Sequence, residues 1–204
     1  MDKFDDFILF PRLEKELRHL SDYPEEIDAP LIFHGLPGIG KTSFANYLSE
    51  KHASNHWSFD GSNENKKQND MLVHIKNSMM YSALDGDDNK HFSRAYILDE
   101  WHDLSNTKQN QFKITFDEIT DRGDSLVILC LNTSPKHDKE TLEKLVTPAI
   151  VSRCDVYDFT PLAAEVEDVI EILQDKYPLL SEDWINNTYP DLRKITRKGR
   201  KTLS

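Results

Sequence analysis

The most constraining feature of this sequence is a glycine-rich segment, Gly35–Thr42, which reads GLPGIGKT and fits the pattern GxxxxGK[ST]. The apolar run Leu31–His34 precedes the segment and predicts a buried strand, and the amphipathic stretch Lys41–Lys51 follows it and predicts a helix. Glycines allow a turn whose amides point at phosphate oxygens, and the start of the following helix carries partial positive charge. The pattern and its context therefore predict a phosphate-binding loop.

The side chains of such a loop have separate tasks. Lys41 is expected to hold the β- and γ-phosphates of a nucleotide, and Thr42 is expected to ligate Mg²⁺. We therefore predict ATP and Mg²⁺ as ligands. The expected nucleotide contacts are Gly35, Pro37, Gly38, Ile39, Gly40, Lys41, Thr42 and Ser43.

A second signal is the apolar run Ala95–Leu98, which ends in the two acids Asp99 and Glu100. Carboxylates at the end of a buried strand are costly unless a cation lies nearby. Together with the phosphate-binding loop, the pair predicts that Asp99 binds Mg²⁺ through water and that Glu100 polarises the water attacking the γ-phosphate. These residues predict an ATP-hydrolysing domain.

Asn132 ends another apolar run, Leu126–Leu131. An asparagine at a strand end is often only a turn-former. Because ligands of parallel sheets lie beyond the carboxyl ends of the strands, Asn132 is also placed to hydrogen-bond the attacking water or the γ-phosphate. We favour this second interpretation.

Short apolar segments alternate with longer amphipathic ones up to Phe159, which predicts a parallel sheet covered by helices on both faces. Three helices are expected after that point. We predict an α/β nucleotide-binding domain over residues 1–160 and a small helical lid over residues 161–204. The expected strands are 31–34, 57–59, 94–98, 125–131 and 156–159, and the expected helices are 41–51, 70–83, 105–119, one from about 161 to 176, one after Ser181 and one from Pro190.

Composition restricts the function further. The 204 residues are 38% hydrophobic and 30% charged, with no apolar run long enough for a bilayer and no secretion signal at the N-terminus, so we expect a cytoplasmic protein without a membrane partner. Two cysteines, Cys130 and Cys154, favour neither disulfides nor zinc. The net charge of -11 argues against indiscriminate nucleic-acid binding, although the last thirteen residues carry +6.

The order of these motifs resembles that of the AAA+ ATPases, and within them the small subunits of sliding-clamp loaders, especially those of T4-like phages. The matching segments are Gly35–Thr42, Phe59–Asn63, Asp99–Glu100, Leu131–Ser134, Ser152–Cys154 and Tyr189–Lys194, and the resemblance spans about residues 4–195. It implies an AAA+ P-loop NTPase core with a parallel sheet flanked by helices, followed by a small helical lid.

The resemblance also implies roles for residues outside the loop. Arg153 would be an arginine finger that acts in trans on a neighbour's ATP, so hydrolysis would depend on assembly. Arg193 would contact the γ-phosphate in cis, and Ile8 would lie beside the adenine. Expected DNA contacts are Lys66, Lys67, Lys108, Gln109 and Lys113.

The implied function is a phage-encoded ATPase subunit of a DNA-replication clamp loader, located in the host cytoplasm. ATP binding would open a sliding clamp, and hydrolysis on primer-template DNA would release it. Its partners would be other loader subunits, in a homo- or hetero-oligomer, together with the clamp and the DNA. Members of the family continue after the lid into a helical collar, before which this sequence ends. Either the protein assembles differently, or its collar is a separate chain or was cut away.

Two residues depart from the family's pattern. Asp60 occupies the position of an asparagine that restrains the catalytic glutamate, and a carboxylate there would repel Glu100. Trp101 replaces the usual alanine after the acidic pair.

Three other functions remain as alternatives. The segment Asp99–His102 spells the DExH box of helicases, although about 100 residues after it are too few for a second motor domain. A viral superfamily 3 helicase, or another AAA+ remodeller of replication proteins, is closer in size. A loader subunit that binds ATP without hydrolysing it is the third, and the intact set of catalytic groups argues against it.

Overall fold

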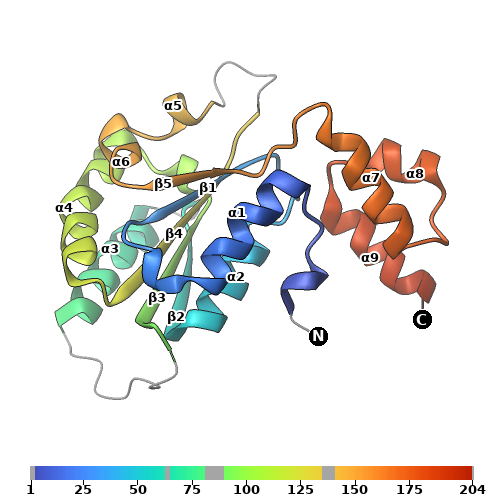
Figure 1. The fold of residues 1–204 in the computed structure, drawn as a ribbon. Helices are drawn as coiled ribbons and strands as arrows, with labels where there is room; N and C mark the ends of the chain where they lie inside the picture. Colours follow the sequence, from blue (N-terminus) through green and yellow to red (C-terminus); the bar gives the residue numbers. More distant parts are fainter. Residues whose placement is uncertain (1–2, 63–64, 81–89, 135–140, 204) are drawn as a thin grey trace.

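The computed structural model describes residues 3–62, 65–80, 90–134 and 141–203. Its centre is a five-stranded parallel sheet with the strand order β2-β3-β4-β1-β5. The strand that leads into the glycine-rich loop, β1, therefore lies between β4 and β5, with all carboxyl ends at one edge (Figure 1). The strands are β1 (Leu31–Gly35), β2 (Ala53–Asp60), β3 (Phe92–Asp99), β4 (Ser125–Asn132) and β5 (Asp155–Asp158).

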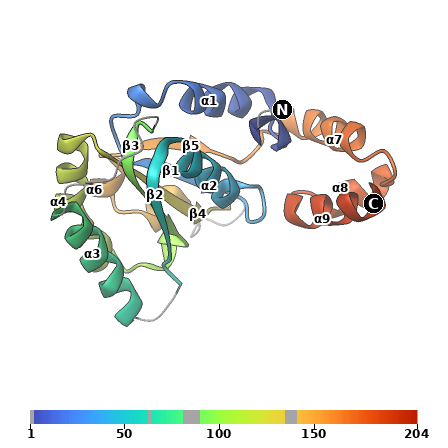
Figure 2. The ribbon, with the colours of Figure 1, turned by 90° about the horizontal axis from the view of Figure 1, so that it is seen from below.

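Helices cover both faces of this sheet, with α1 and α2 on one face and α3, α4 and α6 on the other (Figure 2). Three more helices, α7 to α9, follow β5 and lie to one side of the sheet (Figure 1). The α-helices are α1 (Pro11–Asp22), α2 (Lys41–His52), α3 (Asn65–Met80), α4 (Asn106–Arg122), α5 (Leu142–Leu145), α6 (Pro148–Val151), α7 (Glu165–Lys176), α8 (Glu182–Thr188) and α9 (Leu192–Leu203). The 3₁₀ helices are η1 (Lys3–Asp6), η2 (Pro24–Glu26) and η3 (Trp101–Asp103).

Strand residues alternate between two hydrophobic clusters, which explains why the central strands are almost continuously apolar. Leu31 and Phe33 pack toward α1 and α2, whereas Ile32 packs toward α3 and α4. The same alternation holds in β4, where Ile128 and Leu129 belong to opposite clusters. A sheet buried on both faces requires apolar side chains in both directions, as expected for parallel strands.

The helices after β5 bury one apolar side each and expose charges on the other. Leu173 of α7, Ile185 of α8 and Ile195 of α9 are fully buried. On α9 the basic residues are exposed, and the ammonium of Lys198 lies 3.8 Å from the centre of the Trp184 ring. The basic C-terminal segment is thus the polar face of a packed helix. Among the described residues, no helix combines the length and the apolar character needed to span a bilayer.

The elements expected from the sequence are present, with differences at their ends. Helix α1 was not expected, although Leu13, Leu17 and Leu20 are buried at helical spacing. Strand β2 is longer than the expected segment 57–59. It is an edge strand with few apolar residues, so the apolar pattern did not show its full length. Helix α3 begins at Asn65 rather than at residue 70, and residues 81–83 of that expected helix lie outside the described part. Short helices α5 and α6 were also missed.

Candidate functional site

The glycine-rich loop connects the carboxyl end of β1 to the first turn of α2. Gly35 has a φ of +144° and lies so close to the next segment that a Cβ would come within 3.0 Å of the Thr160 nitrogen. Gly38 has a φ of +78°, and a Cβ there would meet the Asp191 side chain at 3.0 Å. Side chains at either position would strain the loop or push away its neighbours. The glycines are thus required for the turn that leads to Lys41, the first residue of α2.

Lys41 is buried inside the turn of its own loop. Its Nζ donates hydrogen bonds to the carbonyls of Gly35 at 3.0 Å and Leu36 at 2.7 Å, and to Oδ1 of Asn132 at 2.9 Å. Asn132 can reach it because β4 pairs with β1 in a register that sets Asn132 opposite Gly35. The structure thus places the two predicted phosphate ligands, Lys41 and Asn132, side by side.

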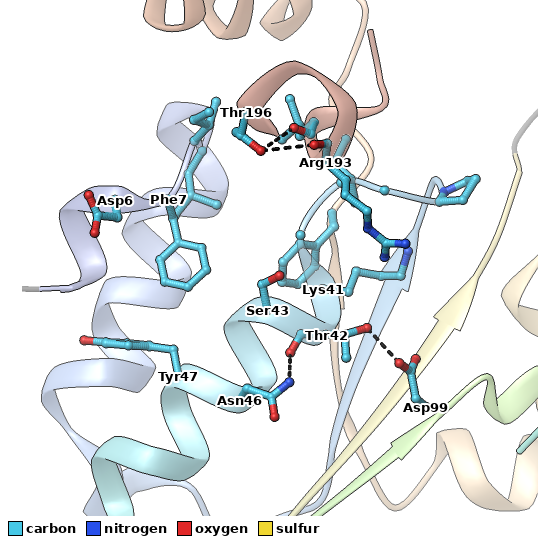
Figure 3. Close-up of a pocket in the computed structure, with 18 of the residues that line it drawn as sticks. Asp6, Phe7, Lys41, Thr42, Ser43, Asn46, Tyr47, Asp99, Arg193 and Thr196 are labelled. Atoms are coloured by element: carbon cyan, nitrogen blue, oxygen red, sulfur yellow. Dashed lines mark hydrogen bonds between the residues drawn. The ribbon is translucent and has the colours of Figure 1, made fainter. Parts of the chain in front are cut away.

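Thr42 and Asp99 meet at the carboxyl edge of the sheet, where the Thr42 hydroxyl donates to Oδ2 of Asp99 at 3.0 Å (Figure 3). The other carboxylate oxygen, Oδ1, accepts from the backbone N–H of Glu100 at 3.0 Å. A hydroxyl and a carboxylate are the hard oxygen ligands that Mg²⁺ prefers. This donor set fits the ion that the sequence predicts, with Thr42 and Asp99 as the residues that would hold it.

Glu100 follows Asp99 in a left-handed conformation, with a φ of +49° that is uncommon outside glycine. Its carboxylate accepts from Nδ2 of Asn132, at 3.1 Å to Oε2 and 3.4 Å to Oε1. Partial burial raises the pKa of Glu100 above its ordinary value, and the nearby carboxylate of Asp99 acts in the same direction. A carboxylate with a raised pKa is a stronger base, which suits the task predicted for it.

These residues line a pocket of about 640 Å³, a size typical of ligand sites. Figure 3 shows Lys41 and Thr42 at one end and Phe7 and Tyr47 farther along. The predicted contact Ile8 also lines the pocket. The remaining predicted residues of the loop that line it are Pro37, Gly38, Ile39, Gly40 and Ser43.

The pocket also contains residues that the sequence analysis did not select. From α2 these are Asn46, Tyr47 and Glu50, which follow Ser43 at spacings of three, four and seven residues. Residues at these spacings share one helix face. Once Ser43 was expected at the nucleotide, the same spacing could have identified these three residues as pocket residues. Thr196 and Arg200 of α9 extend the wall beyond Arg193 in the same way.

The last helix, α9, closes the pocket by touching the loop directly. The backbone N–H of Arg193 donates to the carbonyl of Gly38 at 3.3 Å. Its side chain extends into the pocket toward Lys41 (Figure 3). The first turn is stabilised by the Asp191 carboxylate, which accepts from the backbone N–H of Lys194 at 2.9 Å. Arg193 therefore adds a positive charge to the part of the pocket that contains Lys41.

Arg153 lies outside this pocket, in the segment between α6 and β5. Its guanidinium donates to both carboxylate oxygens of Asp117, at 2.7 Å and 3.2 Å, and to the Ala149 carbonyl at 2.7 Å. Arg153 thus has an ion-pair partner in its own chain. None of these three hydrogen bonds joins Arg153 to a residue of the pocket. The role of Arg153 toward a neighbouring chain therefore stays a prediction.

The residues expected at DNA lie in and around α3 and α4. Lys108 and Lys113 are half-buried on α4, and the side chains of Lys66 and Lys67, in the first turn of α3, lie outside the described part. The prediction for Gln109 is wrong, because its side chain is only 1% exposed. Its amide donates to the carbonyls of Leu104 and Leu145 and accepts from the backbone N–H of Thr147.

Replacing Gln109 by leucine is expected to destabilise the protein by about 2–4 kcal/mol, because three buried backbone groups would lose their partner while the volume barely changes. Urea denaturation followed by circular dichroism measures this free energy of unfolding. The matched control is Gln111→Leu, which alters an exposed residue of the same helix and should change stability by less than about 0.5 kcal/mol. Equal effects of the two variants would contradict the structural role of Gln109.

Two departures from the family pattern now have a structural description. The Asp60 carboxylate accepts hydrogen bonds from the backbone N–H of Ser62 at 2.9 Å and from its hydroxyl at 2.5 Å. The indole of Trp101 is fully buried and packs against Phe112 and Phe116 of α4, with ring centres 5.0 Å and 5.9 Å away. Trp101 therefore belongs to the core that fixes α4 behind the acidic pair.

Burial lowers the pKa of Lys41 to about 8. The free protein therefore loses the Lys41 proton as the pH rises through 8, whereas a bound triphosphate favours the charged ammonium. Affinity for ATP is expected to fall about tenfold between pH 7 and pH 9. Calorimetric titration with ATP measures this change, and Lys41→Arg, whose charge persists, should remove the pH dependence. An affinity of the unmodified protein that is equal at both pH values would contradict the prediction.

Comparison with known proteins gives a consistent result. No protein-family model matches the chain. Replication factor C small subunits of Methanococcus maripaludis (strain C6) and Methanococcus vannielii are 27% and 26% identical over 160 residues, which is 78% of this chain and 47% of each relative. Over most of its length, this chain is similar to replication factor C small subunits. It spans about half the length of the curated relatives it matches.

Solved structures support the fold. The replication initiator DnaA bound to AMPPCP and single-stranded DNA aligns with a TM-score of 0.60 at 14% identity, over 97% of this chain and 63% of that one. A DNA replication initiation factor aligns at 0.57 and 16% identity, over 98% of this chain and 63% of that one. C. elegans PCH-2 aligns with a TM-score of 0.51 at 17% identity, over 86% of this chain and 50% of that one. The predicted AAA+ P-loop NTPase fold is confirmed.

Proposed function

We propose that this chain is an ATPase subunit of a DNA-replication sliding-clamp loader. One observation carries the proposal. In a chain similar to replication factor C small subunits, Lys41, Thr42, Asp99, Glu100 and Asn132 meet in one pocket at the carboxyl edge of the sheet. A lysine, a hydroxyl, two acids and an amide at this place are the groups that phosphoryl transfer to water needs.

Each group has a task in the proposed hydrolysis of ATP to ADP and phosphate. The Lys41 ammonium would leave its loop carbonyls to pair with the β- and γ-phosphates, since those oxygens carry full charge. Glu100 would orient a water and accept its proton as the oxygen attacks the γ-phosphorus and the bond to the bridging oxygen breaks. Asn132, which bonds both side chains, would hold Lys41 and Glu100 in place. Mg²⁺, held by Thr42 and Asp99, would neutralise phosphate charge when bound.

Two arginines would complete the site from different directions. Arg193 would contact the γ-phosphate in cis, from a lid formed by residues 161–204 that follows a nucleotide-binding domain of residues 1–160. Arg153 would act in trans as an arginine finger, so the active form would be a homo- or hetero-oligomer. Asp117 would keep the guanidinium oriented until a neighbour's ATP is present, since an exposed ion pair is weak.

The proposed partners follow from this assignment. They are other loader subunits, a sliding clamp and primer-template DNA, with Lys66, Lys67, Lys108 and Lys113 as phosphate contacts. ATP binding would hold the clamp open, and hydrolysis on primed DNA would release it. We propose a phage gene as the source, with the host cytoplasm as the place of action. The two helicase alternatives and the non-hydrolysing scaffold are separated from this proposal by the experiment below.

The test is steady-state ATP hydrolysis by the purified chain, with and without primer-template DNA and the sliding clamp encoded in the same genome. We expect a low rate alone and a rise of at least about tenfold when both are added, because assembly supplies the trans arginine. Stimulation by single-stranded DNA in place of primed DNA and clamp would favour a helicase. No hydrolysis under any condition would favour a scaffold.

A further inference from the structure

His102 lies next to the catalytic acid and has no role in the mechanism above. It is the last residue of the sequence DEWH and belongs to η3, the single turn that follows β3. Its Nε2 lies 3.3 Å from Oε2 of Glu100, and its side chain is 21% exposed. The same Oε2 accepts from Nδ2 of Asn132 at 3.1 Å. The Glu100 carboxylate is therefore contacted by nitrogen atoms from β4 and from η3.

The surroundings of the imidazole indicate which nitrogen carries the proton. Within the described structure, Nδ1 of His102 is buried without a hydrogen-bond partner. A buried N–H without an acceptor costs more than a bare ring nitrogen, whereas Nε2 faces the carboxylate of Glu100 and lies 3.9 Å from that of Asp103. The tautomer with hydrogen on Nε2 fits both facts. Nε2 of His102 then faces the Glu100 carboxylate at 3.3 Å as a close polar contact.

The turn that carries His102 is anchored by the preceding residue, Trp101. Trp101 is fully buried against Phe112 and Phe116, so the turn that carries His102 is anchored in the core. The backbone of the same turn is closed by hydrogen bonds from Asp103 to the Glu100 carbonyl at 3.0 Å and from Leu104 to the Trp101 carbonyl at 3.1 Å. A donor on a rigid turn can restrict the rotamers of the side chain it touches.

We propose that His102 is a positioning residue for Glu100, which it holds together with Asn132 so that the carboxylate stays directed at the attacking water. The proposal rests on the proposed ATPase function. It explains the DExH-like sequence without a helicase, since the histidine serves the acid two residues before it. The role differs from that of Asp60, which occupies the family's restraining position and binds Ser62 instead.

The proposal predicts that two substitutions of His102 have unequal effects on kcat. Glutamine can bring its amide nitrogen to the place of Nε2, whereas the shorter asparagine brings its nitrogen only to the place of Nδ1. His102→Asn is therefore expected to lower kcat for ATP hydrolysis about three- to tenfold with KM unchanged, because Glu100 loses orientation and not ATP contacts. His102→Gln should retain most of the unmodified kcat.

The experiment compares steady-state ATP hydrolysis by the full chain and its variants, with primer-template DNA and clamp present. His56 of β2 is exposed, so His56→Asn and His56→Gln are matched controls that should leave kcat unchanged. In a Glu100→Gln background, His102→Asn should have no further effect, since the carboxylate that it positions is gone. Thermal unfolding of each variant checks that the turn is still folded.

The outcomes distinguish the role of His102 from the ATPase function. A normal kcat for His102→Asn, or equal losses for the asparagine and glutamine variants, would overturn the role of His102 while Glu100→Gln still lowers kcat by about 10²–10³-fold. A further loss from His102→Asn in the Glu100→Gln background would overturn it as well. If Glu100→Gln hydrolyses ATP as fast as the unmodified chain, the proposed function is wrong, and the positioning role is overturned with it.

Discussion

Replacing Lys41 by alanine is expected to weaken ATP binding by about 100-fold. The ammonium lies at the centre of the loop, and it is expected to exchange three neutral acceptors for phosphate oxygens when ATP binds. Charge-assisted hydrogen bonds contribute about 1.5–3 kcal/mol each, so losing one or two accounts for a change of this size. The dissociation constant is measured by titration with a fluorescent ATP analogue or by calorimetry.

The control for this prediction is Lys76→Ala, which removes an equal charge from an exposed position of α3 and should not alter the affinity. Thermal unfolding of Lys41→Ala checks that the loop is still folded, because the carbonyls of Gly35 and Leu36 and the Asn132 amide lose their donor in this variant. An affinity within a factor of three of the unmodified value would show that the loop does not bind the triphosphate.

Replacing Glu100 by glutamine is expected to lower kcat by about 10²–10³-fold and to leave ATP binding intact. Glutamine keeps the size of the side chain and its acceptor oxygen toward Asn132, but it cannot take a proton from water. The two effects are measured separately, by steady-state hydrolysis and by equilibrium binding. Together, the two measurements distinguish a catalytic base from a residue that binds the nucleotide.

Glu118→Gln, on the exposed face of α4, is the matched control and should hydrolyse ATP at the unmodified rate. Should Glu100→Gln retain more than about a tenth of the unmodified kcat, the general base would have to be another group. A loss of ATP affinity in Glu100→Gln equal to its loss of rate would contradict the division of labour between Lys41 and Glu100.

The sequence was sufficient for the part of the site that is local in the chain. Gly35–Thr42 is one turn between a strand and a helix, and the acids Asp99 and Glu100 directly end an apolar strand. In both cases the motif and its structural context are adjacent residues. The rule that ligands lie at the carboxyl edge of a parallel sheet then brought Asn132 to the same place.

The errors have physical causes. Gln109 is one of several polar residues at the start of α4, and a polar type predicts an exposed side chain unless its partners are known. Its partners include the carbonyl of Leu145 and the N–H of Thr147, from a segment more than thirty residues away in the chain. Helix α1 was missed although its leucine spacing, its proline at the first position and the charged residues between the leucines all fit an amphipathic helix.

The pocket wall beyond the glycine-rich loop also depended on tertiary structure. Thr196 and Arg200 line it because α9 packs back onto the loop through the contact between Arg193 and Gly38. Arg153 pairs with Asp117 of α4, which lies 36 residues earlier in the chain. Such contacts leave no periodic pattern in the sequence, so an amphipathic helix does not reveal which surface it will meet.

The central claim is that one chain completes the ATPase site of another, and mixing two inactive variants tests it most directly. Glu100→Gln keeps its finger and lacks its base, whereas Arg153→Ala keeps its base and lacks its finger. We predict that each is nearly inactive alone, with primed DNA and clamp present, and that their mixture regains a substantial part of the unmodified rate. Arg197→Ala, another exposed arginine, should be fully active alone. A mixture no faster than the sum of its components, or an Arg153→Ala variant as fast as the unmodified chain, would contradict the claim.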